Sequence, residues 1–176
     1  MEEMEVPTEH LHENINEHAE HSKDKWSMYL AVSTAIMAVL AAFGSLLAGH
    51  HSNEALISQL KSSDQWAYYQ AKGVKYEILR GVSMLDKESK ATEALKADMD
   101  KYKKEQAEIT IKANDFSKES EMNLDKHNTV SYGVTLFQIA IAISAISMLT
   151  GKRFLWYFSI VLSLGGVVLL ALSYFK

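Results

Sequence analysis

The sequence predicts an all-α integral membrane protein with three transmembrane helices and a long antiparallel helical hairpin, a coiled coil, outside the bilayer. Three runs, each of about 20 residues without a formal charge, have the length needed to cross a hydrocarbon core of about 30 Å. The one proline, Pro7, stands near the start, so no later proline interrupts a helix. The charged segment between the first and second runs carries a seven-residue apolar repeat, which is typical of helix pairing.

The predicted spans are Met28–Ala48, Val130–Leu149 and Phe154–Phe175, within helices at 26–50, 128–150 and 154–175. Buried helices of a soluble protein are the alternative. Three such runs exceed what a chain of 176 residues can cover, so we expect membrane lipid to surround them.

Small residues recur at helical spacing in all three spans. Such stripes let helices approach closely in lipid, either within one bundle or between subunits. In the first span the stripe is a candidate oligomer interface: Ala31, Ala35, Ala38 and Ala42. The second span carries Gly133, Ala140, Ser144, Ser147 and Gly151, and the third Ser159, Ser163, Gly166 and Ser173.

One polar face accompanies the second span, formed by Asn128, Ser131, Thr135 and Gln138. Such a face would line a pore in an oligomer, or its side chains would bond to a neighbouring helix. No acid or base lies inside a span, whereas proton relays and pumps usually need one.

The segment 51–127 leaves the membrane and returns to it on the same side. One straight helix of this length could not return, so we expect an antiparallel hairpin with a turn at 86–92. Folded there, Leu60 would face Phe116. The predicted seam comprises Ile57, Leu60, Asp64, Ala67, Ala71, Val74, Ile78, Gly81 and Leu85 on the first arm, and Leu95, Met99, Tyr102, Gln106, Ile109, Ala113 and Phe116 on the second.

Aromatic residues follow the first span, and Trp66, Tyr69 and Tyr76 share a helical face that we expect beside this seam. A rigid aromatic stripe is typical of assembly surfaces, so these residues are candidates for an oligomer interface or a protein partner. The alternative is that lysine and glutamate stems of the same hairpin cover them.

The N-terminal tail, residues 1–25, is acidic and rich in histidine. His10, His12, His18 and His21 are weak candidate ligands for a transition metal. A solvated, pH-sensitive tail is the competing interpretation. In the short connection between the last two spans, Lys152 and Arg153 favour a cytoplasmic N-terminus with the hairpin outside.

Three stretches are similar to a known family: EEMEVPTEHLHE at the start, LAGHHSNEA at the end of the first span, and SDQWAYYQAK after it. Through them the whole chain resembles the bacterial membrane family filed as domain of unknown function 4337. The resemblance implies a three-span, multi-pass protein of the bacterial inner membrane. It implies no activity, substrate or catalytic residue.

The motifs leave few function classes. The chain has no cysteine, no glycine-rich phosphate loop and no metalloprotease helix motif, and we expect neither catalysis nor a cofactor. No basic patch with interleaved aromatics favours nucleic acid. The sequence therefore predicts a homo-oligomeric membrane protein of structural, scaffold or interaction type that presents a rigid hairpin. The alternatives are an oligomeric channel or a histidine-rich metal or pH sensor.

Overall fold

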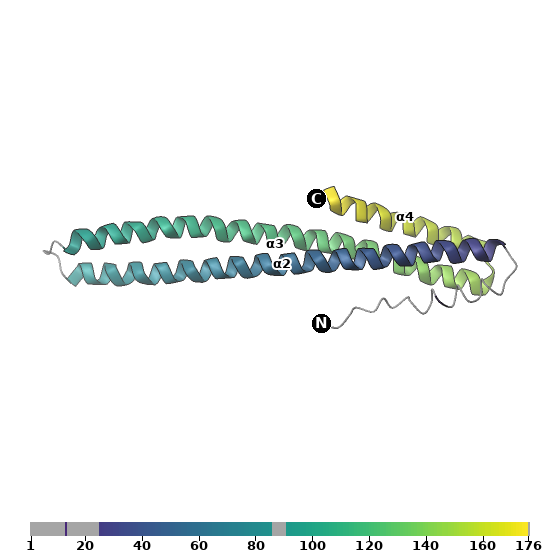
Figure 1. Cartoon of the computed structure of the whole chain (residues 1–176), viewed down its shortest axis with the longest axis horizontal. Helices are drawn as coiled ribbons and strands as arrows, with labels where there is room; N and C mark the ends of the chain where they lie inside the picture. The colour runs from purple at the N-terminus through teal and green to yellow at the C-terminus, as the bar shows by residue number, and fades with distance from the viewer. Residues whose placement is uncertain (1–12, 14–24, 86–90, 176) are drawn as a thin grey trace. The chain divides into compact units, whose positions relative to one another are not determined.

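Three long helices make up the computed structural model, which describes residue 13 and residues 25–85 and 91–175. They are α2 (Lys25–Leu85), α3 (Ala91–Thr150) and α4 (Arg153–Phe175), drawn in Figure 1. The described residues contain helices and no strand, which confirms the predicted all-α class. The absence of proline after Pro7 agrees with helices of 61 and 60 residues.

A two-residue connection separates α3 from α4. Gly151 has a φ of 67°, the left-handed conformation that commonly ends a helix and favours glycine. The Ser147 hydroxyl donates to the Lys152 carbonyl at 3.0 Å, and the Leu155 amide donates to the same oxygen at 3.1 Å. Gly151, which the sequence grouped with the small residues of the second span, is exposed and serves this turn instead.

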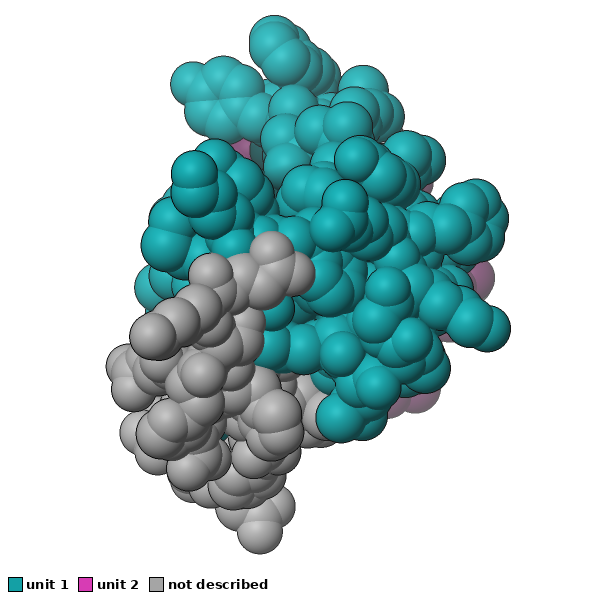
Figure 2. All heavy atoms as spheres, turned by 90° about the vertical axis from the view of Figure 1, so that its right-hand side faces the viewer, with its two compact units in different colours: residues 1–52, 124–176 teal, residues 53–123 magenta. Residues whose placement is uncertain are grey.

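The chain divides into two compact units, which Figure 2 colours separately. Unit 1 comprises residues 1–52 and 124–176, and unit 2 comprises residues 53–123. Helices α2 and α3 each contribute residues to both units. The predicted limits of spans and hairpin therefore fall inside continuous helices, and they stay predictions.

Unit 1 contains the three apolar segments, and each lies in a helix long and apolar enough to cross a membrane. The helices meet in apolar clusters built on Leu30, Ala31 and Ala145, on Met37, Ala140 and Ile141, and on Ala48, Val130 and Val134. Large apolar side chains also point outward, such as Leu46 and Val161. A unit that is apolar inside and outside is typical of a membrane bundle.

Small residues form much of the contact between α3 and α4. Of the α4 residues, Ser159, Ser163, Gly166 and Ser173 are buried, the same four that the sequence placed on one stripe. The Ser144 and Ser159 hydroxyls lie 2.9 Å apart and share a hydrogen bond. A Cβ placed on Gly166 would lie 3.0 Å from the Gly133 carbonyl, so these backbones approach closely. These stripes therefore pack within the chain.

Unit 2 pairs the second part of α2 with the first part of α3. The Ser120 hydroxyl donates to the Ala55 carbonyl at 2.8 Å, and the Ser62 hydroxyl donates to the Ala113 carbonyl at 2.9 Å. Partner numbers fall along α3 as they rise along α2, so the segments run antiparallel. Lys61 lies over Phe116, one residue from the predicted partner Leu60. The predicted turn at 86–92 falls largely outside the described residues, between the end of α2 and the start of α3.

The predicted seam is right for α3 and wrong for α2. On α3, the seven predicted positions from Leu95 to Phe116 are buried or half-buried. On α2, all nine predicted positions from Ile57 to Leu85 are exposed. The fold turns a different face of α2 towards α3. Near the start of unit 2 this face carries the small residues Ala55, Ser58 and Ser62, which let two helices approach more closely than leucine or isoleucine would.

Candidate interaction surface

The face of α2 that packs on α3 is called the inner seam. It consists of Ala55, Ser58, Ser62, Gln65, Tyr69, Lys72, Tyr76, Leu79 and Ser83, all buried or half-buried and spaced by alternating steps of three and four. Serine hydroxyls within it and opposite it reach across to backbone carbonyls, as for Ser62 and Ser120. Direct hydrogen bonds between a serine hydroxyl and a facing carbonyl therefore join the two helices at these two places.

Lys72 is the charged centre of the inner seam. Its ammonium nitrogen forms an ion pair with Glu105, at 2.6 Å from Oε2. The same nitrogen lies 5.0 Å and 5.2 Å from the ring centres of Tyr68 and Tyr102. Lys72 lowers the pKa of the Glu105 carboxyl, and Glu105 raises the pKa of the Lys72 ammonium. The sequence alone does not indicate this pair, because Lys72 lies outside the predicted seam.

The opposite side of α2 in unit 2 is called the outer face. It consists of Ile57, Leu60, Asp64, Ala67, Ala71, Val74, Ile78, Gly81 and Leu85, the residues predicted to form the seam with α3. Three of its large side chains are well exposed: Leu60 by 65%, Val74 by 60% and Ile78 by 59%. In unit 2, α2 thus turns a partly polar face towards α3 and exposes a face with several large apolar side chains.

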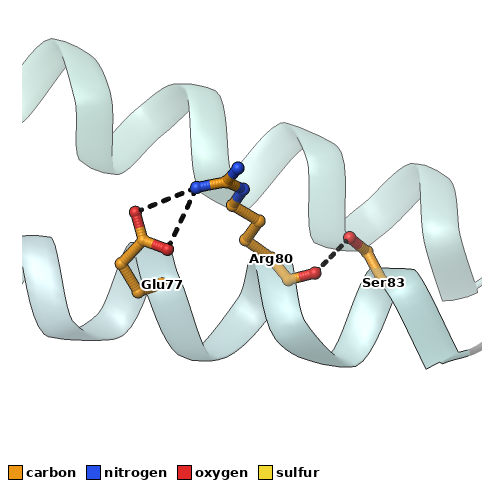
Figure 3. Close-up of polar contacts among 3 residues, drawn as sticks. All are labelled: Glu77, Arg80 and Ser83. Carbon is orange, nitrogen blue, oxygen red and sulfur yellow. Dashed lines mark hydrogen bonds and ion pairs between the residues drawn. The ribbon is translucent and has the colours of Figure 1, made fainter.

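One charged pair beside the outer face lies on α2 itself. Figure 3 shows Arg80 Nη1 between the two carboxylate oxygens of Glu77, at 3.3 Å and 3.5 Å. The Ser83 hydroxyl donates to the Arg80 carbonyl at 2.8 Å (Figure 3). Because Glu77 already has a partner one helical turn away, it needs none from another chain.

The three residues of the predicted aromatic surface differ in how far they are buried. Tyr69 and Tyr76 are half-buried in the inner seam, so the expectation that they stand beside the seam is wrong. Trp66 is 39% exposed, and its ring meets that of Tyr69 edge-on with the centres 5.6 Å apart. A role for these three residues between subunits stays a prediction.

The small stripe of the first span lies partly inside unit 1. Ala31 is buried in an apolar cluster with Leu30 and Ala145. Ala35 and Ala38 are half-buried, and Ala42 is exposed. Ala42 is therefore the member of the predicted interface that another subunit would reach most easily.

The polar residues predicted as a pore face lie along α3. Asn128 and Thr135 are exposed, and Ser131 and Gln138 are half-buried. The Thr135 hydroxyl donates to the Ser131 carbonyl at 2.9 Å, so it is satisfied within its own helix. Asn128 also lines an open groove with Asp125, Thr129, Tyr132, Leu169, Leu172 and Phe175.

The candidate metal ligands His10, His12, His18 and His21 lie outside the described residues. Within the described part of the chain, no group of three or more histidine, aspartate or glutamate side chains is placed to hold a metal ion. His127 Nδ1 lies 2.8 Å from the Ala48 carbonyl, a contact that joins α3 to α2 within unit 1.

Comparison with known proteins gives one match. No curated protein and no solved structure is similar to the chain at a significant level. A sequence profile of the family described as Domain of unknown function (DUF4337) matches residues 26–176, from the start of α2 through the C-terminal residue. The match includes all three long helices, and so the chain belongs to the DUF4337 family.

Proposed function

We propose that the protein is a homo-oligomeric integral membrane protein of structural or scaffold type. The antiparallel helices of unit 2 form a rigid coiled-coil hairpin that extends from the bilayer on the non-cytoplasmic side. The proposal assigns no catalytic activity. The outer face is the observation that supports this proposal. Its broad apolar surface lies in the segment between two predicted spans, where lipid tails would not cover it.

Membrane insertion is supported by the ends of the apolar helices. The Arg153 guanidinium lies 5.8 Å from the Trp26 ring centre, so the starts of α2 and α4 meet. The Trp156 indole nitrogen donates to the Ser33 hydroxyl at 3.0 Å at the same end. Tryptophan with arginine and lysine is typical of a membrane interface, and the cations favour the cytoplasmic side of a bacterial inner membrane.

The test is the subunit number of the full chain, extracted from membranes in a mild detergent. Light scattering that separates protein mass from detergent mass should give a multiple of the 19.8 kDa chain. A protein that stays monomeric over a wide concentration range, and also in lipid nanodiscs, contradicts the proposal.

An oligomeric channel is the second candidate, and the exposed Thr135 and half-buried Gln138 on α3 favour it. Thr135 and Gln138 would leave lipid if they faced one another across a subunit boundary. Vesicles that contain the protein would then conduct ions, and Gln138→Leu would reduce the flux. Vesicles with reconstituted oligomer and no flux above empty vesicles contradict the channel.

A further inference from the structure

We infer that the outer face of α2 binds the same face of α2 in a second copy of this chain, with the two helices parallel. The inference rests on the proposed function, since it names the contact that would hold the oligomer together. It replaces the aromatic surface that the sequence indicated, because two of those aromatic residues lie in the inner seam.

The outer face has the form of a coiled-coil seam, which suits a second helix as its occupant. Its nine residues follow alternating steps of three and four from Ile57 to Leu85, without an insertion. This repeat brings one side chain per half-heptad onto a single line, which fits the holes of another helix. The inner seam keeps the same period on the opposite side of α2, where the occupant is α3. One helix thus carries two seams, and the chain itself fills one of them.

The exposed area matches what a stable contact needs. Four apolar side chains flank the outer face, Leu56, Tyr68, Val82 and Met84, and each is about half exposed. With them, the exposed apolar surface is on the order of 1,000 Å². A patch on a soluble monomer is usually about 300–600 Å². Each partner in a standard interface contributes about 800 Å².

A shared membrane explains why the occupant is a second copy and why it is parallel. Copies inserted the same way in one bilayer are related by an axis normal to it, so their α2 helices run in one direction. Small residues at Ala67, Ala71 and Gly81 let two such helices approach closely. The tail at 1–24 precedes the first span, so in the proposed topology the bilayer separates it from the outer face.

The charged residues at and beside the outer face are Asp64, Lys61, Lys75 and Glu77. Lys61 lies over the Phe116 ring, and Glu77 is paired with Arg80. Asp64 is the single charged residue among the nine. In a parallel pair it would lie near Asp64 of the other copy, which weakens the contact and fixes the register, as polar residues do in coiled coils. Removing this charge should therefore strengthen the pair.

The absence of native cysteine makes disulfide cross-linking a direct test. We would introduce Val74→Cys or Ile78→Cys into the full chain and oxidise it in native membranes. Both variants should give a covalent dimer. Gln59→Cys on another side of α2 and Ile111→Cys on α3 are matched controls, because both residues are exposed but lie off the outer face. Equal cross-linking at the controls, or none at Val74 and Ile78, overturns the inference.

Substitutions that add or remove a charge provide a second test of the inference. Val74→Glu with Ile78→Glu should raise the dissociation constant of the pair at least about ten-fold, since two apolar contacts become repulsive. The control, Ala107→Glu with Ile111→Glu, has the same spacing on α3 and should leave the dissociation constant unchanged. Asp64→Leu should lower the dissociation constant. Circular dichroism should show unchanged helix content, because all five residues are exposed.

The outcomes separate the inference from the proposed function. An oligomer that persists in detergent, without cross-links at Val74 and Ile78, overturns the inference and leaves the oligomeric membrane protein standing. A monomer overturns both. If the outer face instead binds lipid headgroups or another protein, the glutamate variants change that binding but not the subunit number, which also overturns the inference.

Discussion

At the scale of single residues, two neighbouring glycines of α4 have different surroundings. A Cβ on Gly166 would meet the Gly133 carbonyl at 3.0 Å and Phe137 at 3.0 Å, whereas a Cβ on Gly165 would meet Leu136 at an ordinary 3.4 Å. Only the first contact requires the backbone of another helix to move. The smallest possible side chain at residue 166 therefore sets the spacing of α3 and α4.

Gly166→Ala should destabilise unit 1 by about 1–3 kcal/mol, the usual effect of overpacking. Gly165→Ala is the matched control and should be neutral or slightly stabilising, because alanine favours a helix more than glycine does. Thermal unfolding in one detergent would compare the two. Equal melting temperatures for both variants would show that the close approach has no effect on stability.

The ion pair of Lys72 and Glu105 predicts a pH dependence. The pKa of Glu105 is lowered in the folded chain, so its contribution is present above its ordinary value of about 4.3 and is lost as pH falls through the lowered value. The pKa of Lys72 is raised, so its contribution is present below about 10.4 and is lost as pH rises through the raised value. The pair therefore stabilises unit 2 between these limits.

This dependence can be measured by following the melting temperature of the full chain from pH 7 to pH 3. The parent should lose more stability over this interval than Glu105→Gln, which has no carboxyl to protonate at that position. Glu108→Gln is the control, since Glu108 is an exposed carboxylate on the same helix. Identical pH profiles for the parent and Glu105→Gln would contradict a stabilising role for the pair.

At the scale of elements, the two sides of α2 in unit 2 differ in what they contact. Ser62 is buried, and its hydroxyl bonds to the Ala113 carbonyl, whereas Leu60 is exposed on the outer face. Ser62→Leu should destabilise the pairing of α2 and α3 by about 1–3 kcal/mol through overpacking, and more through the lost hydrogen bond. Leu60→Ser should change it by less than about 0.5 kcal/mol.

Both variants would be compared in a protein that already carries Val74→Glu and Ile78→Glu, so that pairing of the outer face does not contribute. Chemical denaturation in detergent, followed by helix content, would measure them. A larger loss for Leu60→Ser than for Ser62→Leu would show that the larger apolar residues, and not the small ones, hold the two helices together. That result would restore the seam that the sequence alone predicts.

The sequence predicted the helices and one side of their packing. Long runs without charge or proline were enough to predict the all-α class, and serine and glycine spacing was enough to predict the buried side of α4. On α2 the periodicity held but its phase did not. Both phases repeat every seven residues, and the more apolar one is the phase that the sequence pattern predicts. Burial in a single chain favours Ala55, Ser58 and Ser62 instead, because small residues pack tightly and serine can bond to the facing backbone.

The functional surface was harder to predict for the same reason. A heptad repeat predicts that one face of a helix packs against another helix. It does not predict which helix that is. The repeat therefore predicts that Leu60 and Val74 pack on a helix, but the prediction that this helix is α3 is wrong. The ion pair of Lys72 with Glu105 depends on the correct phase and was missed with it.

At the scale of the whole molecule, topology gives a further prediction. With a cytoplasmic N-terminus and the hairpin outside, a single cysteine at Lys104, an exposed residue of unit 2, should react with an impermeant maleimide in intact cells. A single cysteine at Lys152, in the connection between α3 and α4, should react only after the membrane is permeabilised. The reverse labelling pattern would invert the orientation and leave the helical architecture unchanged.

The central claim is that this chain assembles in the membrane through the apolar side of α2 that it does not cover itself. The most direct measurement is oxidative cross-linking of Val74→Cys in native membranes, together with the subunit number of the same preparation. The claim predicts a covalent dimer at Val74, none at Gln59→Cys or Ile111→Cys, and a mass above one chain. A monomeric mass, or a dimer that forms equally well at the control positions, would contradict it.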